Sequence, residues 1–76
     1  MRQRIKQLLE EAIPYVDFDG DFLFAEMDSL GVTTVLMILS EEFGIELSAA
    51  DATPRNLKSL DSIVALVEAK QAEKKK

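Results

Sequence analysis

Apolar residues recur at helical spacing near the start, the middle and the end of the chain. In the first stretch, the residues on one side of a helical wheel are Ile5, Leu8, Leu9 and Ala12. Pro14 follows, and a proline pushes the preceding residue out of helical geometry. The pattern therefore predicts a first helix over residues 2–13.

The strongest amphipathic pattern runs from Ser29 to Phe43 and predicts a second helix. Asp28 or Ser29 is the expected N-cap, and Gly44 supplies the C-terminal stop. One face is expected to join the core: Val32, Val35, Leu36, Leu39 and Phe43. The opposite face consists of four residues: Leu30, Thr34, Met37 and Glu41. Two of them, Leu30 and Met37, are apolar and have no core to pack against.

A long connection over residues 15–27 separates these two helices. We expect Phe22, Leu23 and Phe24 to pack this loop onto the core, since a long loop in a small domain needs such anchors. Further on, Thr53 as N-cap and Pro54 at the first helical position predict a short third helix of about one turn.

Ser59 is expected to cap a last helix over residues 60–72, whose inward face holds Leu60, Ile63, Val64 and Val67. The basic tail over residues 73–76 is expected to be flexible. The predicted fold is all-α: a small bundle of three main helices, one short third helix and a long first loop. Residues 1–72 form its single domain.

Length and composition argue against an enzyme. A domain of 76 residues buries only about 60% of the surface that its unfolded chain exposes, so a deep catalytic cleft is not expected. The chain has no histidine and no cysteine. This removes disulfides, the common zinc sites, the usual general base and a thiolate nucleophile. The lack of cysteine fits a cytoplasmic protein.

Charge is unevenly distributed along the chain, whose formal net charge is −5. No lysine or arginine occurs between Gln7 and Pro54, where most of the acids lie. Because this region would repel phosphates, nucleic acid is not an expected partner, and a protein with a basic patch is. No apolar run is long enough to span a membrane or to form a signal peptide, so a soluble cytoplasmic monomer is expected.

The acidic run over residues 17–21 has carboxylates at positions one, three and five, as an EF-hand calcium loop does. Such a loop also needs glycine at position six and glutamate at position twelve, where this chain has Phe22 and Asp28. The run is therefore interpreted as a solvated acidic loop with weak attraction for cations, and no metal site is expected.

Ser29 is the candidate functional residue because it stands at the start of the second helix. A helix N-terminus is electropositive and has unpaired N–H groups, so a phosphate ester on this serine would be stabilised. Catalysis by Ser29 is not expected, since no histidine or nearby lysine could take its proton. A second Asp-Ser pair at Asp61-Ser62 is interpreted as simple helix capping, so the dipeptide by itself decides nothing.

The surroundings of Ser29 resemble the phosphopantetheine attachment region of acyl carrier proteins. In that family an Asp-Ser-Leu motif ends a long first loop and opens the second helix, and here the match is Asp28-Ser29-Leu30. The family's helix closes with a sequence similar to Glu41-Glu42-Phe43-Gly44-Ile45-Glu46. The resemblance covers essentially the whole chain and implies that residues 1–72 are a single carrier domain.

The resemblance implies that a phosphopantetheinyl transferase moves 4′-phosphopantetheine from coenzyme A to Ser29, with Asp28 beside it in the cofactor-binding site. The arm would carry acyl groups as thioesters between ligases or synthases, in fatty acid, polyketide or specialised metabolite synthesis, so the protein would not itself be an enzyme. One alternative is an aminoacyl (D-alanyl-type) carrier loaded by a stand-alone adenylate-forming ligase. Another is an unmodified helical adaptor in which Ser29 is only a cap.

The resemblance also assigns the outward face of the second helix to partner binding, through Leu30, Met37 and Glu41, with Glu42 as a further acid. Met suits a surface that meets several partners. Three residues stand where carriers of fatty acid synthesis usually have acids: Gly31, Thr34 and Ser40. A less acidic face favours the aminoacyl alternative. Gly31 is also expected to loosen the first helical turn.

Overall fold

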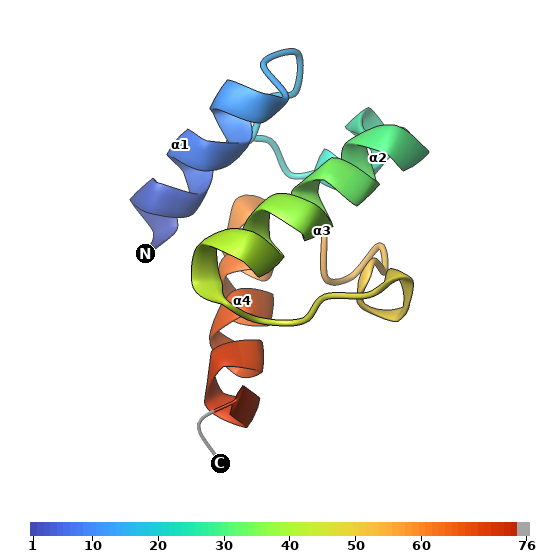
Figure 1. The fold of residues 1–76 in the computed structure, drawn as a ribbon. Helices are drawn as coiled ribbons and strands as arrows, with labels where there is room; N and C mark the ends of the chain where they lie inside the picture. Colours follow the sequence, from blue (N-terminus) through green and yellow to red (C-terminus); the bar gives the residue numbers. More distant parts are fainter. Residues whose placement is uncertain (75–76) are drawn as a thin grey trace.

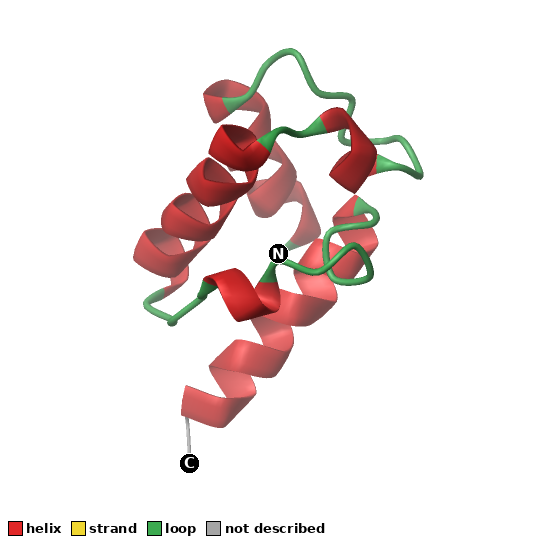
Figure 2. Ribbon diagram, turned by 90° about the vertical axis from the view of Figure 1, so that its right-hand side faces the viewer, coloured by secondary structure: helices red, strands yellow, loops and turns green. Residues whose placement is uncertain are grey.

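The structure is a computed structural model that describes residues 1–74, and in this part every regular element is a helix (Figures 1 and 2). The elements follow in the order α1 (Arg2–Ala12), α2 (Leu23–Glu26), α3 (Ser29–Phe43), the 3₁₀ helix η1 (Ala49–Asp51) and α4 (Leu60–Lys74). The molecule measures 36 × 24 × 19 Å. The predicted all-α class is confirmed.

The three long helices α1, α3 and α4 contact one another in pairs and enclose one core. Each contributes fully buried aliphatic side chains: Ile5 and Leu9, Val35 and Leu39, and Leu60, Ile63 and Val67. Helical spacing explains this arrangement, because residues three or four apart stack on the same face. In α1 the inward face is narrower than predicted, since Leu8 is half-buried and Ala12 is exposed.

Helix α3 begins and ends where the sequence predicts. The Asp28 carboxylate accepts a hydrogen bond of 2.7 Å from the Gly31 N–H, which makes Asp28 the N-cap. At the other end Gly44 adopts a left-handed conformation with φ 61°, which glycine enters without a steric penalty. The buried Ile45 then donates its N–H to the Ser40 carbonyl at 3.1 Å and leads the chain back toward the core.

The long first connection packs down through two of the three predicted anchors. Leu23 is buried and Phe24 is partly buried against the core, whereas Phe22 is 71% exposed, so its predicted anchoring role was wrong. Phe18, which was not predicted, is buried as well. The unpredicted helix α2 forms in this connection. The Leu23 N–H at its start donates to the Lys58 carbonyl at 2.9 Å, which ties the loop to the segment before α4.

The third helix was predicted in the wrong place. The structure instead has η1, whose capping box joins Ser48 and Asp51 through reciprocal hydrogen bonds. Thr53 does cap a single turn, since its hydroxyl accepts from the Asn56 N–H at 3.0 Å and its carbonyl accepts from the Leu57 N–H at 3.0 Å. That turn is too short to continue as a helix.

Helix α4 starts after Ser59, as predicted, and runs to Lys74, two residues beyond the expected end. The Ser59 hydroxyl accepts from the Ser62 N–H at 3.3 Å, which is the predicted cap. Glu73 and Lys74 therefore belong to the helix and not to a separate tail. Residues 75–76 lie outside the described part, and the flexibility of the tail stays a prediction.

Candidate functional site

Ser29 is the first residue of α3 and is exposed at the end of the long connection. The neighbouring Asp28 already caps the helix through the Gly31 N–H. The hydroxyl of Ser29 is consequently not needed for capping, although the sequence allowed either residue to serve. The Ser29 carbonyl accepts a hydrogen bond of 2.9 Å from the Thr33 hydroxyl within the first turn.

The electrostatics of this helix start suit an anion on Ser29. The first turn of α3 contains no acidic residue, and the helix is 15 residues long, so its N-terminal dipole is well developed. Asp28 supplies one negative charge at the cap and satisfies one backbone N–H. The remaining free N–H groups of the first turn point toward the side on which the chain enters the helix.

Gly31 does not lie on the outward face, contrary to the expectation from the acyl carrier resemblance. It is buried, and a Cβ atom at this position would lie 3.3 Å from the Asp28 Oδ1 and 3.4 Å from the Tyr15 hydroxyl. The absence of a side chain thus lets the Tyr15 hydroxyl and the capping carboxylate approach the first turn.

An open groove of about 550 Å³ lies beside Ser29. Its lining is largely apolar and comes from α2, α3 and the η1 segment: Phe24, Met27, Asp28, Ser29, Val32, Thr33, Leu36, Ala49 and Ala52. Leu36 was predicted to be a core residue, and this was wrong, because it is half-buried and lines the groove. A helical wheel places it near the core stripe but cannot reveal the gap between α3 and η1.

The outward face of α3 exposes the two apolar residues singled out in the sequence, since Leu30 is 74% and Met37 is 54% exposed. Glu41 is exposed as well, and the Thr34 hydroxyl donates to the Leu30 carbonyl at 2.8 Å. Glu42 is instead engaged in an ion pair with Arg4 of α1. This leaves Glu41 as the exposed acid of this face outside any ion pair among the described residues.

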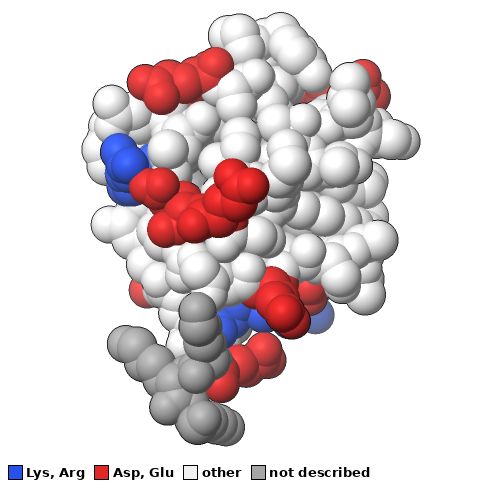
Figure 3. All heavy atoms as spheres, viewed as in Figure 1, with Lys and Arg blue, Asp and Glu red and all other residues white. Residues whose placement is uncertain are grey.

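Ser40 also differs from the expectation, because it is half-buried and serves the end of the helix. Its hydroxyl donates to the Leu36 carbonyl at 2.7 Å and accepts from the Leu47 N–H at 3.2 Å. The side chain therefore fixes the segment that leaves α3 and is not part of a docking surface. In Figure 3, acidic side chains form separate groups on a surface that is otherwise mostly uncharged.

The acidic loop is held by its own hydrogen bonds. The Asp17 carboxylate accepts from the Asp19 N–H at 3.0 Å, the Glu26 carboxylate accepts from the Asp17 N–H at 3.3 Å, and Lys6 pairs with Asp19 at 3.0 Å. Within residues 1–74, no three potential metal-ligating side chains gather at one point. The carboxylates of Asp17 and Asp19 thus have structural partners.

The second Asp-Ser pair lies in a different environment from the first. Ser62 is half-buried in the first turn of α4, and its hydroxyl is 3.2 Å from the Ser59 hydroxyl. Its backbone N–H is satisfied by the same residue. Ser62 is therefore part of a capping arrangement, as the sequence predicts, and is less accessible than Ser29.

The chain matches the profile of a protein family described as "phosphopantetheine attachment site" over residues 1–69. It belongs to that family. Members of the family hold 4′-phosphopantetheine covalently, and domains of this kind are carriers of substrates. No curated protein and no solved structure gives a significant match. The resemblance to acyl carrier proteins drawn from the motif around Ser29 is thereby confirmed.

The residues at the start of α3 fit such a group. A serine that receives phosphopantetheine must be reachable by a second protein, and Ser29 is exposed and free of capping duty. When attached, the group supplies the thiol on which a thioester can form. The chain has no thiol of its own, because it has no cysteine. Within the described part, no helix has the length and apolar character needed to cross a bilayer.

Sequence reasoning missed two features near the site: the groove and the ion pair between Asp51 and Lys70, whose atoms are 3.2 Å apart. The Ser48 N–H, as the main cause, and Lys70 lower the pKa of Asp51 below its ordinary value of 3.8. The hydrogen bond to Asp51 raises the pKa of Lys70 above 10.5. Asp51 and Lys70 are 19 positions apart, so no local sequence pattern predicts that they form an ion pair.

Proposed function

We propose that this protein carries acyl groups as thioesters on a phosphopantetheine arm attached to Ser29. The observation that carries the proposal is the combination at the start of α3: an exposed serine relieved of capping by Asp28, beside an apolar groove. An N-capping serine in an adaptor would need neither the exposure nor the groove. This argues against the alternative of an unmodified adaptor.

The chemistry requires little from the chain itself. A phosphopantetheinyl transferase provides the base that takes the proton of the Ser29 hydroxyl. The Ser29 oxygen attacks the phosphopantetheine phosphorus of coenzyme A, the pyrophosphate bond breaks and adenosine 3′,5′-bisphosphate leaves, so the product is a phosphodiester at the positive end of α3. Asp28 keeps the first turn ordered so that Ser29 is presented at a fixed position. The lack of histidine in the chain is compatible with this division of tasks.

The groove supports an acyl cargo with an apolar chain. Six of the residues that line it are apolar: Phe24, Met27, Val32, Leu36, Ala49 and Ala52. An acyl chain attached through Ser29 could lie there and lose contact with water, which stabilises apolar groups by about 0.8 kcal/mol per buried CH₂. Fatty acid, polyketide and specialised metabolite synthesis all use such cargo.

The partner face supports the aminoacyl alternative as a second candidate. Leu30, Met37 and Glu41 give this face two exposed apolar contacts and a single acid free of ion pairs within the described residues. The matching surface on a loading ligase or synthase would be an apolar patch with one or two basic side chains. This patch carries less positive charge than the basic patch expected from the sequence. A stand-alone adenylate-forming ligase of narrow specificity would meet that description.

Intact-mass measurement tests the attachment. Incubation with coenzyme A and a broad-specificity phosphopantetheinyl transferase should add one phosphopantetheine group to the protein. The Ser29→Ala variant should remain unmodified, whereas Ser62→Ala, the matched Asp-Ser control, should be modified as the wild type is. A folded wild-type protein that stays unmodified beside an active transferase would refute the proposal.

A further inference from the structure

The ion pair between Asp51 and Lys70 joins η1 to α4. Asp51 closes η1, and Lys70 lies 19 positions later on α4. Their side chains are only 18% and 25% exposed. Every other ion pair found in the described residues has at least one side chain that is more exposed than both of these.

The position of η1 depends on this ion pair because of how η1 is held in the fold. None of the three η1 residues is buried. Leu47 before η1 and Ala52 after it pack against the core, and Asn56 Nδ2 donates to the Asp51 carbonyl at 3.0 Å, but none of these contacts joins η1 to α4. The Asp51 carboxylate uses one oxygen for the Ser48 N–H at 3.0 Å and offers the other to Lys70 at 3.2 Å. The same residue thus shapes η1 and ties it to α4.

The position of η1 in turn defines one side of the groove beside Ser29. Ala49 at the start of η1 and Ala52 directly after it both line that groove, opposite α3 residues such as Leu36. A shift of η1 relative to α4 therefore changes the width of the groove. The side chains of Asp51 and Lys70 do not line the groove, so they can affect its width only through the position of η1.

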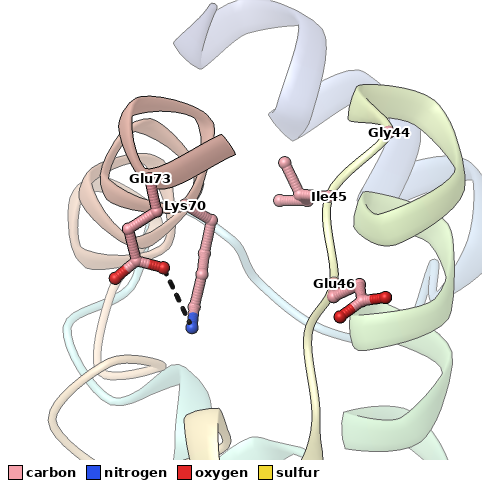
Figure 4. A pocket seen from close by; sticks show the side chains of 5 residues that line it. All are labelled: Gly44, Ile45, Glu46, Lys70 and Glu73. Carbon is pink, nitrogen blue, oxygen red and sulfur yellow. Dashed lines mark ion pairs between the residues drawn. The ribbon is translucent and has the colours of Figure 1, made fainter. Parts of the chain in front are cut away.

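Lys70 has a second carboxylate within reach, which makes the ion pair releasable. Its Nζ is 3.6 Å from Glu73 on the same helix. Figure 4 shows these two side chains running alongside one another from α4, across from the connection that carries Ile45 and Glu46. A hollow of about 460 Å³ lies between them and that connection. A displacement of η1 would therefore leave the Lys70 ammonium paired with Glu73.

We propose that Asp51 and Lys70 are positioning residues that hold η1 against α4 and thereby set the width of the groove beside Ser29. Groove width then determines how much of a cargo chain is shielded from water. A short acyl group reaches little of the groove lining and a longer one lies along more of it, so the shielding of the longer group depends more on the position of η1. This inference rests on the proposed function for its cargo, but the position of η1 can be measured without any cofactor.

Amide hydrogen exchange on the unmodified protein tests the position of η1. In Lys70→Met, which keeps the length of the side chain without its charge, the amides of residues 49–52 should exchange about three to ten times faster than in the wild type. Amides of α1 and α3 should keep their rates, and Lys70→Arg should restore slow exchange. Lys58→Met, which removes an exposed lysine, is the matched control. Equal rates in Lys70→Met and wild type, or a uniform rise across all helices, would overturn the proposal.

Thioester hydrolysis tests the consequence for cargo. The phosphopantetheinylated protein and its Lys70→Met variant are loaded with acetyl or octanoyl groups, and release of the free thiol is followed over time. The variant should change the octanoyl-to-acetyl ratio of hydrolysis rates by about threefold or more, while Lys58→Met leaves it unchanged. An unchanged ratio would overturn the role in cargo shielding. Failure to attach phosphopantetheine at all would refute the proposed function, whereas the exchange experiment would still decide how η1 is held.

Discussion

Two adjacent residues at the start of α3 have separate tasks. Asp28 satisfies the Gly31 N–H at 2.7 Å, and Ser29 is left exposed for modification in the function proposed above. The sequence narrowed the cap to these two residues, but only the geometry shows which one serves. Gly31 completes the arrangement, since a side chain there would press on the capping carboxylate and on Tyr15.

Asp28→Ala should lower the free energy of unfolding by about 1 kcal/mol, because the Gly31 N–H loses its partner. Asp28→Ser should restore most of this loss, since serine also caps helices well. Urea unfolding followed by circular dichroism measures the effect. Asp21→Ala is a suitable control, because Asp21 is exposed and makes no hydrogen bond or ion pair within residues 1–74. Equal stability of Asp28→Ala and wild type would contradict the capping role.

At the scale of elements, the sequence predicted the long helices well and the short ones poorly. Helices α1, α3 and α4 repeat apolar residues over three or four turns, and their ends carry Pro14, Gly44 and Ser59 as local signals. Helices α2 and η1 are each about one turn long, too short for a periodic pattern. Their positions depend on tertiary contacts such as the hydrogen bond from Leu23 to Lys58.

For the same reason, the sequence predicted some residues of the site but not the groove beside them. Ser29 and Asp28 could be singled out because a motif and a helix start coincide at one place in the sequence. The groove could not be, because its sides come from segments that meet only in the folded molecule. Leu36 illustrates the difference: its helical position is near the core stripe, yet the gap beside η1 turns it into a groove residue.

Leu39→Ala and Leu36→Ala should therefore differ in their effect on stability. Leu39 is fully buried, so its truncation should cost roughly 2–5 kcal/mol by leaving a cavity. Leu36 is half-buried beside an open groove, and its truncation should cost about 1 kcal/mol, since solvent already reaches that space. Urea unfolding of the two variants gives both values. Equal losses would mean that Leu36 supports the core as Leu39 does.

At the scale of the whole molecule, ion pairs between distant segments decide which charges a partner meets. Arg4 of α1 occupies Glu42 of α3, and Arg2 occupies Asp61 of α4. The sequence shows acids concentrated in the middle of the chain and basic residues at its ends, but not that the ends fold back to pair with them. The net charge of −5 consequently overstates how acidic the α3 face is.

Arg4→Gln should release Glu42 and strengthen docking of a partner with a basic patch, by about two- to fivefold at low salt. Met37→Lys and Glu41→Lys should weaken the same docking while changing the free energy of unfolding by less than about 0.5 kcal/mol, because both residues are exposed. The apparent KM of a phosphopantetheinyl transferase for each variant reports docking.

Arg2→Gln is the matched control for this experiment, since it breaks an ion pair of α1 with α4 and leaves Glu42 occupied. Its KM should equal that of the wild type. The gain in Arg4→Gln should fade as salt rises above about 0.15 M, where exposed charges are screened. No change in KM for Met37→Lys and Glu41→Lys would mean that partners bind another surface.

The central claim, that Ser29 carries the arm, is tested most directly by locating the modification within the chain. Trypsin is unsuitable because no lysine or arginine lies between Gln7 and Pro54. Cleavage before aspartate places Ser29 and Ser62 on separate peptides that start at Asp28 and Asp61. After treatment with transferase and coenzyme A, the peptide that starts at Asp28 should be heavier by one phosphopantetheine, and the peptide that starts at Asp61 should be unmodified. Fragmentation of the first peptide in the mass spectrometer should place the group on Ser29 and not on Ser40 or Ser48. Modification of any other residue, or of none, would contradict the claim.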